Sequence, residues 1–362
     1  MEVIYIKIRE SNIEILRIIA IIMVIGLHYL NENMGGALGA LNNGHINYYI
    51  AHYIESLNIV SVNLFVIVSS YFLVDKSIPK ISKVIKLVIL AYFYGLLFYI
   101  IGIIFNINKF SFIGLIKSIN LFLYGGYWFV KIYIILYLLS PFINNFISIL
   151  NKKSHKGIII IIGIFFSVWP SFLPHAPNDD NGYGIISFVF LYLIVAYIKK
   201  YYESNKSTEY YICIYFLAIS ITFVFSIIPF KSVWTYNFVF NIIGSIALFL
   251  GIKKIKLKSN IINYIAKYTF AIYLIHFNKT MIILVFKGLL RCEDFYYSKL
   301  FIINLIISII IIFLISFIIE FIRRMVINLI DKLIPNRLKL SIKSIENKFN
   351  ISFYNLIYGN LI

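Results

Sequence analysis

The residues of this chain best suited to chemistry are an arginine and a histidine inside its first long apolar run. Arg17 and His28 are eleven residues apart, and an α-helix turning about 100° per residue returns to within about 20° of the same face over that distance. The two side chains therefore share one helix face, about 16 Å apart along the axis. Glu14 lies on nearly the same face, three residues before Arg17. Because a charge buried in hydrocarbon costs at least about 2.5 kcal/mol, a polar face inside a membrane span points to function.

The composition places the whole chain in a lipid bilayer. Of its 362 residues, 61% are hydrophobic, compared with about 45–50% in an average soluble domain. The net charge of +18 could suggest a nucleic-acid partner, but the basic residues fall in short loops between apolar runs, so we expect none. The only cysteines, Cys213 and Cys292, lack a partner at metal-ligand spacing, and we expect neither a disulfide nor a bound metal.

Ten apolar runs are long enough to cross about 30 Å of hydrocarbon, although the fifth and sixth are short. They predict an all-α, polytopic helix bundle with about ten transmembrane helices. The runs lie at 13–30, 57–74, 86–106, 128–149, 157–173, 184–198, 210–229, 233–252, 265–286 and 299–320.

Lysine and arginine alternate between the loops in a way that predicts the orientation. Twenty-four of the 33 basic residues fall on one set of alternate loops and the termini, six on the other set and three inside spans. Basic loops face the cytoplasm, so we expect both termini to be cytoplasmic in a multi-pass protein of the cell (plasma or inner) membrane. We expect a transmembrane domain over residues 1–322 and a basic cytoplasmic tail over 323–362, lying on the inner membrane surface.

Depth along the spans brings further polar residues toward the first helix. The second span runs back toward the cytoplasm, which puts Asn63 near the depth of His28 and both Ser69 and Ser70 nearer that of Arg17. Two neighbouring antiparallel helices would then line one cavity, with its cation near the cytoplasm and its imidazole toward the outside.

Other candidates come from the outer ends of later spans and from an outer loop. Tyr127 and Trp128 begin the fourth span, where aromatic residues also form ordinary interfacial belts. His276 is a second histidine inside a span, and a hydrogen-bonded packing role is its simpler interpretation. Asp179 and Asp180 lie in an outer loop suited to hydroxyl-bearing ligands such as sugars, or to solvation alone.

The ordered motifs resemble the acyltransferase-3 family of integral membrane O-acyltransferases. The Arg-x10-His spacing of Arg17 and His28 is similar to that family's opening motif. Lysines 83 and 86 stand where the family often has Arg-x-x-Arg, and Ser70 stands where it usually has glycine. Lysine keeps the charge of arginine but lacks its bidentate fork. The remaining similar segments are 62–72, 127–142, 181–197 and 270–276.

The resemblance implies transfer of an acyl group, typically acetyl from acetyl-CoA, to a hydroxyl of a surface polysaccharide or lipid-linked sugar, with no permanently bound cofactor. His28 would act as base or as a transient acyl carrier, and Arg17 would bind phosphates or polarise the thioester. Glu14 would orient Arg17. Donor-binding candidates are Arg17, Lys83, Lys86, Ser69 and Ser70, and acceptor-binding candidates are Asn63, Tyr127, Trp128, His276, Asp179 and Asp180.

Transport is the main alternative. A ten-helix protein with buried charges could export or flip a glycan, or carry a solute coupled to an ion. The sequence shows no internal repeat and no matching pair of Gly/Pro-broken helices, which makes the transferase the preferred interpretation. A signalling or structural membrane protein is a third and weaker one.

Overall fold

The chain folds into a helical bundle, which we describe from a computed structural model. The structure describes residues 10–76, 80–119, 126–177, 180–228, 233–333, 344, 347–352 and 354–355. Over these residues the chain is built from helices and contains no strand. The all-α membrane bundle expected from the apolar runs is thereby confirmed.

Seven helical stretches are long and apolar enough to cross a membrane within the part of the chain that the structure describes. Each follows one of the predicted apolar runs. They are α1 (Ser11–Leu30), α3 with α4 (Ile46–Asn58 and Ser61–Leu73), α5 (Ile81–Ile104), α7 (Trp128–Ile149), α8 with α9 (Lys152–Gly163 and Trp169–Phe172), α11 (Thr208–Ile227) and α16 (Phe301–Leu333).

The other three predicted runs also form helices, but shorter or broken ones. α10 (Ile185–Tyr201) has 17 residues, at the lower limit of the roughly 17–25 residues that span a bilayer, and α12 (Val239–Lys253) has 15, which is below that limit. The ninth run bends by 78° between Asn260–His276 and Lys279–Leu289. The structure therefore supports seven spans, or eight with the bent pair, and the count of ten is not confirmed.

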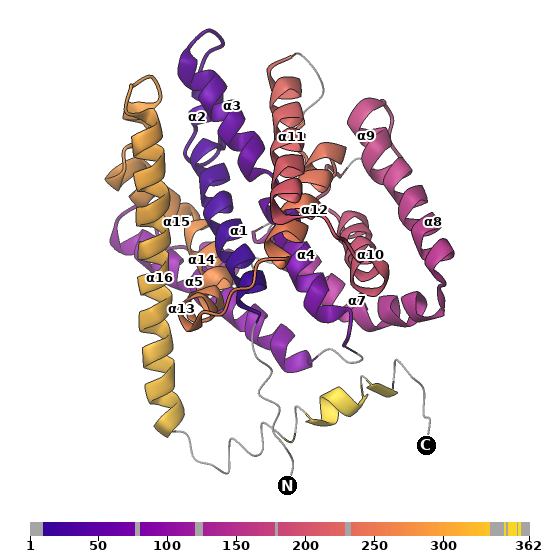
Figure 1. Cartoon of the computed structure of the whole chain (residues 1–362). Coiled ribbons are helices and arrows are strands. Elements are labelled where there is room, and N and C mark those ends of the chain that lie inside the picture. Colours follow the sequence, from indigo (N-terminus) through magenta and orange to yellow (C-terminus); the bar gives the residue numbers. More distant parts are fainter. Residues whose placement is uncertain are drawn as a thin grey trace.

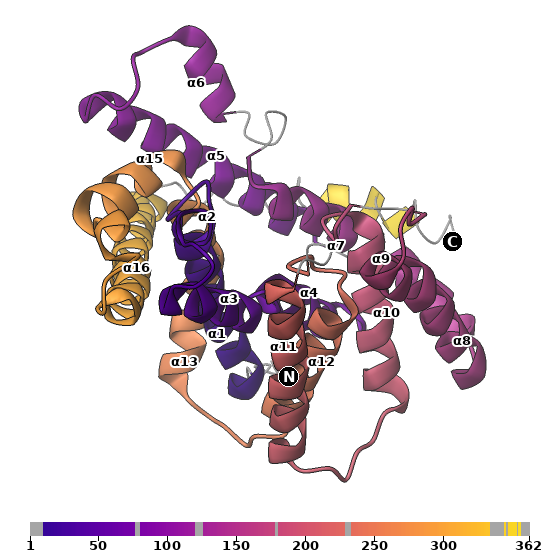
Figure 2. The ribbon, with the colours of Figure 1, turned by 90° about the horizontal axis from the view of Figure 1, so that it is seen from above.

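Helix α1 lies in the interior of the bundle, in contact with α3, α4, α12, α13 (Asn260–Ile265), α14 (Thr269–His276) and α16 (Figures 1 and 2). Its apolar side chains divide between two hydrophobic cores. Leu16 and Ala20 pack into one core together with α4 and α10, whereas Ile21 and Ile25 pack into another together with α14 and α16. The polar face of α1 consequently has buried surroundings rather than lipid.

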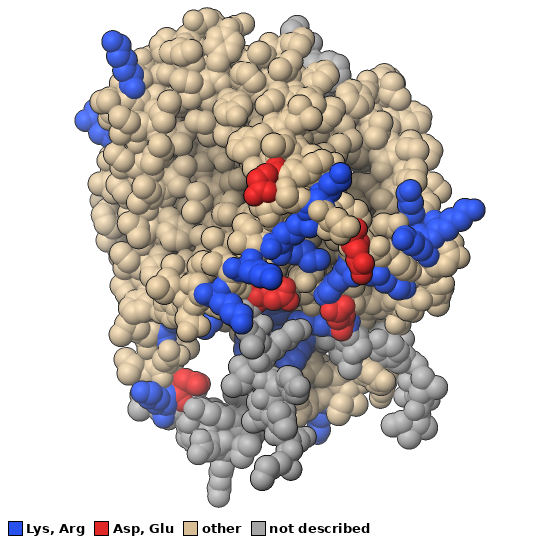
Figure 3. All heavy atoms as spheres, in the orientation of Figure 1, with Lys and Arg blue, Asp and Glu red and all other residues tan. Residues whose placement is uncertain are grey.

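The last long helix, α16, continues without a break to Leu333. It therefore passes through the boundary expected near residue 322, and the first eleven residues of the expected tail are helical. In the face shown by Figure 3, most Lys and Arg lie in a band from the middle right to the lower left, and two more stand at the upper left.

Candidate active site

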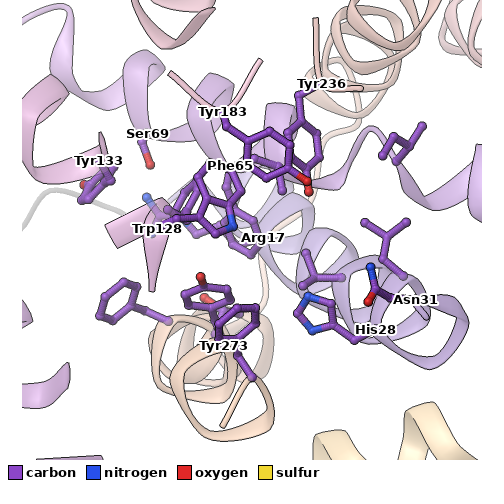
Figure 4. A pocket seen from close by; sticks show the side chains of 18 of the residues that line it. Arg17, His28, Asn31, Phe65, Ser69, Trp128, Tyr133, Tyr183, Tyr236 and Tyr273 are labelled. Carbon is purple, nitrogen blue, oxygen red and sulfur yellow. The ribbon is translucent and has the colours of Figure 1, made fainter. Parts of the chain in front are cut away.

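A cavity of about 1100 Å³ lies inside the bundle, beside the polar face of α1 (Figure 4). Arg17 and His28 both line it, as the eleven-residue spacing requires of two side chains on one face. Its walls come from α1, α2 (Ala37–Ala40), α3, α4, α5, α7, η2 (Ala266–Tyr268), α14 and α16, and from the loops after α1 and before α10 and α12. The polar and aromatic lining residues are Arg17, His28, Asn31, Glu32, Asn33, Glu55, Phe65, Ser69, Lys83, Lys86, Trp128, Phe129, Tyr133, Tyr183, Trp234, Tyr236, Lys267, Thr269, Phe270, Tyr273, Phe277 and Arg324.

Among the described residues, five cations from four helical segments line this cavity, and we call them the cation cluster. They are Arg17, Lys83, Lys86, Lys267 and Arg324. Arg17 is in the second turn of α1, the two lysines are in the first two turns of α5, and Arg324 lies nine residues before the end of α16. Arg324 donates to the carbonyl of Lys267 at 2.8 Å, which joins the last two. A concentration of fixed positive charge beside a partly apolar cavity favours a multiply anionic ligand.

Glu14 fixes the direction of the Arg17 side chain. Nη1 of Arg17 lies 3.1 Å from Oε2 of Glu14, and the carboxylate is buried, with 3% of the residue exposed. The guanidinium also lies over the ring of Phe72, 5.2 Å from its centroid, near the end of α4. Both contacts draw the cation away from His28 and toward the start of α1.

Two further cations are held by polar partners. Lys83 Nζ lies 3.1 Å from the hydroxyl of Tyr133 and 4.6 Å from the ring centroid of Tyr137. Arg324 Nε donates to Oε1 of Glu320 at 2.6 Å, and this glutamate is completely buried. Arginine held by a charged hydrogen bond presents its remaining N–H groups in a fixed geometry. Glu320 therefore fixes the orientation of the Arg324 guanidinium at the cavity.

His28 makes its principal polar contact with the second intramembrane histidine. Nδ1 of His28 lies 2.8 Å from Nε2 of His276, and Nδ1 of His276 lies 2.6 Å from the carbonyl oxygen of Ile272. His276 is fully buried and is not among the residues lining the cavity. It therefore lies behind His28 and holds it, in the hydrogen-bonded position that was the simpler interpretation of this residue.

This chain of two hydrogen bonds fixes the protons on both neutral rings. A carbonyl oxygen can only accept, so Nδ1 of His276 carries its proton and Nε2 of that ring is the acceptor. Nδ1 of His28 must then donate to it. Nε2 of His28 is left with its lone pair, as a general base at the cavity requires.

Three aromatic side chains gather on one wall of the cavity. The ring centroids of Trp128 and Tyr183 are 4.4 Å apart, those of Tyr183 and Tyr236 4.9 Å apart, and those of Trp128 and Tyr236 5.6 Å apart. In Figure 4 the hydroxyl ends of the two tyrosines meet on the side of the cavity opposite Tyr273. We call Trp128, Tyr183 and Tyr236 the aromatic wall.

A tight turn brings Tyr183 to this wall. Asn181 and Gly182 both have positive φ, 54° and 81°, and the carbonyl of Asn181 accepts the backbone N–H of Tyr236 at 2.9 Å. A Cβ on Gly182 would lie 2.5 Å from the backbone nitrogen of Asn237. Only glycine both adopts this conformation without strain and permits such a close approach.

The predicted site residues fall into two groups. Those lining the cavity are Arg17, His28, Ser69, Lys83, Lys86 and Trp128. Those in the described structure that lie outside its lining are Glu14, Asn63, Ser70, Tyr127, Asp180 and His276, and Asp179 lies outside the described residues.

Several of the second group make contacts that support the site from behind. Asn63 donates to the carbonyl of Tyr236 at 2.9 Å, and the Tyr127 hydroxyl donates to the carbonyl of Leu274 at 2.8 Å. Asp180 accepts the N–H of Gly182 at 2.8 Å within the tight turn. Ser70, by contrast, returns its hydroxyl to the carbonyl of Val66 in its own helix.

Sequence reasoning did not assign Glu55, Lys267, Arg324 or Tyr236 to the site. Glu55 offered a usable signal, because a carboxylate next to an apolar run is a functional candidate by the same argument as Arg17. The other three gave little signal, since cations and tyrosines at the ends of apolar helices are common features of membrane proteins.

Comparison with known proteins adds one family. The sequence model of the acyltransferase-3 family, described as an acyltransferase domain, matches residues 10–321. Comparisons with curated proteins and with solved structures found no match. The matched range holds every residue that lines the cavity except Arg324.

Proposed function

The chain belongs to the acyltransferase-3 family, and on that premise we propose that it transfers an acyl group from acyl-CoA to a hydroxyl of a surface polysaccharide or lipid-linked sugar. The family and the apolar helices identify a multi-pass membrane acyltransferase. Acetyl as the acyl group, acyl-CoA as donor and the glycan as acceptor are our proposal. The observation that carries it is one cavity lined by five cations and by a histidine whose free nitrogen is a base.

The cation cluster suits the phosphates of coenzyme A. Arg17 is drawn toward Glu14 and Phe72, about 16 Å in axial distance from His28, which favours phosphate binding over polarisation of a thioester at the base. Lysine supplies charge to a phosphate as a point donor and arginine as a planar fork. The extended pantetheine arm would then carry the thioester along the cavity toward His28.

The proposed reaction is direct transfer at His28. The lone pair on Nε2 removes the proton of the acceptor hydroxyl while its oxygen attacks the thioester carbonyl carbon. The resulting tetrahedral species collapses with cleavage of the C–S bond. The imidazolium returns its proton to the departing thiolate, giving an ester and free coenzyme A. Because the cation cluster and His28 line one cavity, the proposed reaction needs no separate carrier of the acyl group.

The test uses purified protein in nanodiscs with acetyl-CoA and the surface glycan of the source cells. We expect coenzyme A release that depends on the glycan, together with a mass increase of the glycan corresponding to acetylation. His28→Ala should lower the rate by about 10²- to 10⁴-fold, and Arg17→Ala should raise KM for acetyl-CoA. The proposal fails if His28→Ala retains wild-type transfer at normal protein levels, or if the protein moves glycan across vesicles without releasing coenzyme A.

A further inference from the structure

The cavity has a second charged feature, far from its cations. Glu55, on α3, is 8% exposed, lines the cavity, and has no hydrogen-bond partner for Oε2 within the described structure. A buried carboxylate oxygen without a partner is costly to a folded protein. Its retention next to an open cavity indicates that a ligand supplies the missing donor.

Position along the helices puts Glu55 at the opposite end of the cavity from the cations. It lies fourteen residues before Ser69 in the continuous span Ile46–Leu73, which corresponds to about 21 Å along the axis. Glu32, just beyond the end of α1, also lines the cavity. Glu32 is exposed and also lines a neighbouring pocket with Lys287, but Lys287 is not among the described residues that line this cavity.

The aromatic wall and Trp234 line the cavity together with Glu55. A pyranose ring has one apolar face of C–H groups and a rim of hydroxyls. Flat aromatic rings pack against the C–H face. A carboxylate oxygen binds the hydroxyl rim, because it accepts hydrogen bonds strongly.

We propose that the half of the cavity formed by Glu55, Glu32, Trp234 and the aromatic wall binds an uncharged sugar, with Glu55 accepting its hydroxyl hydrogens, and that it excludes acidic sugars. This inference rests on the proposed function and names the class of its acceptor. A uronic-acid carboxylate next to the buried Glu55 would find no lysine or arginine among the described residues of the cavity lining to pair with it there, and burying an anion without a cationic partner strongly disfavours binding. The charge on the cavity thus separates an anionic donor from a neutral acceptor.

The experiment measures sugar binding in the absence of acyl-CoA. Two of the three tryptophans, Trp128 and Trp234, line the cavity, so tryptophan fluorescence of protein in nanodiscs reports occupancy. The probes are methyl glucoside, galactoside and mannoside, each paired with the methyl uronide that differs only by a carboxylate in place of CH₂OH. We expect at least one neutral glycoside to bind about 10-fold more tightly than its uronide.

Substitution of Glu55 tests the origin of this preference. Glu55→Gln keeps the size and an acceptor oxygen but removes the charge, so the preference should fall below about twofold. Glu55→Asp keeps the charge and should retain the preference with weaker binding. Glu203→Gln, which changes an exposed glutamate in the loop after α10, is the matched control and should behave as wild type.

Three results overturn the inference: equal binding of neutral and acidic sugars, no fluorescence response to any neutral glycoside, or an unchanged preference in Glu55→Gln. None of these depends on transfer. Sugar binding and transfer are measured separately, so sugar binding by a protein that never releases coenzyme A would overturn the proposed function and leave this inference standing. Acyl transfer by a protein that binds uronides as tightly as neutral sugars would overturn this inference and leave the proposed function standing.

Discussion

Nδ1 of His28 on α1 lies 2.8 Å from Nε2 of His276 on α14, although the two residues are 248 positions apart in the chain. The contact joins a ring that lines the cavity to one that is fully buried. Because the buried ring is itself fixed by the Ile272 carbonyl, it sets both the orientation of His28 and the nitrogen that is free to take a proton. His276 is therefore a positioning residue for the proposed base.

Replacing His276 should slow the chemical step more than it weakens substrate binding. In His276→Leu the Nδ1 proton of His28 loses its acceptor, and the ring is free to rotate and to change tautomer. We expect kcat to fall by about 10- to 100-fold, the range found when an orienting partner is removed, with KM for acyl-CoA within about twofold of wild type. Steady-state release of coenzyme A measures both.

His276→Gln separates positioning from packing. Glutamine offers a carbonyl oxygen in place of the Nε2 lone pair, so it should recover part of the kcat lost in His276→Leu. If the two variants have equal kcat at equal thermal stability, the hydrogen bond to His28 has no role in orienting the base.

The cation cluster predicts a selective dependence on the phosphates of the donor. Lys83→Ala and Arg324→Ala should each raise KM for acetyl-CoA by about 5- to 20-fold, since hydrogen bonds to charged groups contribute about 1.5–3 kcal/mol before solvent screening weakens them. KM for acetyl-dephospho-CoA, which lacks the 3′-phosphate, shows which residue binds that phosphate. Replacing a residue that binds the 3′-phosphate should raise KM for acetyl-CoA but not KM for acetyl-dephospho-CoA.

Lys287→Ala is the control for that series, because Lys287 pairs with Glu293 at 3.4 Å and does not line this cavity. Its KM for acetyl-CoA should equal that of wild type. The donor assignment is wrong if Lys83→Ala and Lys287→Ala change KM equally.

The sequence was most informative where the geometry is local. Helix periodicity alone places Arg17 and His28 on one face, and the structure puts both on one cavity. The same reasoning paired Arg17 with Glu14, which lie 3.1 Å apart. Contacts within one helix depend on its fixed rise and turn, which a single sequence specifies.

The residues that sequence reasoning missed reach the cavity through packing between distant segments. Tyr236 is held there because Asn63 and Asn181 bond to its backbone, and no local pattern encodes those pairings. Helix length was the other difficulty. Hydropathy counts residues but not where a helix stops, so the count of ten includes the runs that became α10 and α12, which form 17 and 15 helical residues and leave that count unconfirmed.

The turn at Gly182 should be sensitive to a single methyl group. Gly182→Ala places a Cβ 2.5 Å from the backbone nitrogen of Asn237 at a φ of +81°, and the left-handed conformation alone costs a non-glycine residue about 1–2 kcal/mol. We expect a lower thermal midpoint in nanodiscs and weaker sugar binding, because Tyr183 and Tyr236 move apart.

Gly157→Ala provides the matched control on α8. A Cβ at Gly157 has no atom within 4 Å, and alanine is favoured over glycine in a helix by about 0.5–1 kcal/mol. This variant should match or slightly exceed wild-type stability. Equal loss of stability in both alanine variants would show that the tight turn has no special requirement for glycine.

Orientation in the membrane gives a prediction that decides which substrate reaches which end of the cavity. The positive-inside pattern puts the loop after α12, with exposed Lys256, in the cytoplasm, and the loop before α16, with exposed Arg291, outside. In a background of Cys213→Ser and Cys292→Ser, an impermeant maleimide should label Arg291→Cys in intact cells but Lys256→Cys only after lysis. The reverse result would put the cation cluster on the side that lacks coenzyme A, and neither donor binding there nor direct transfer at His28 would survive it.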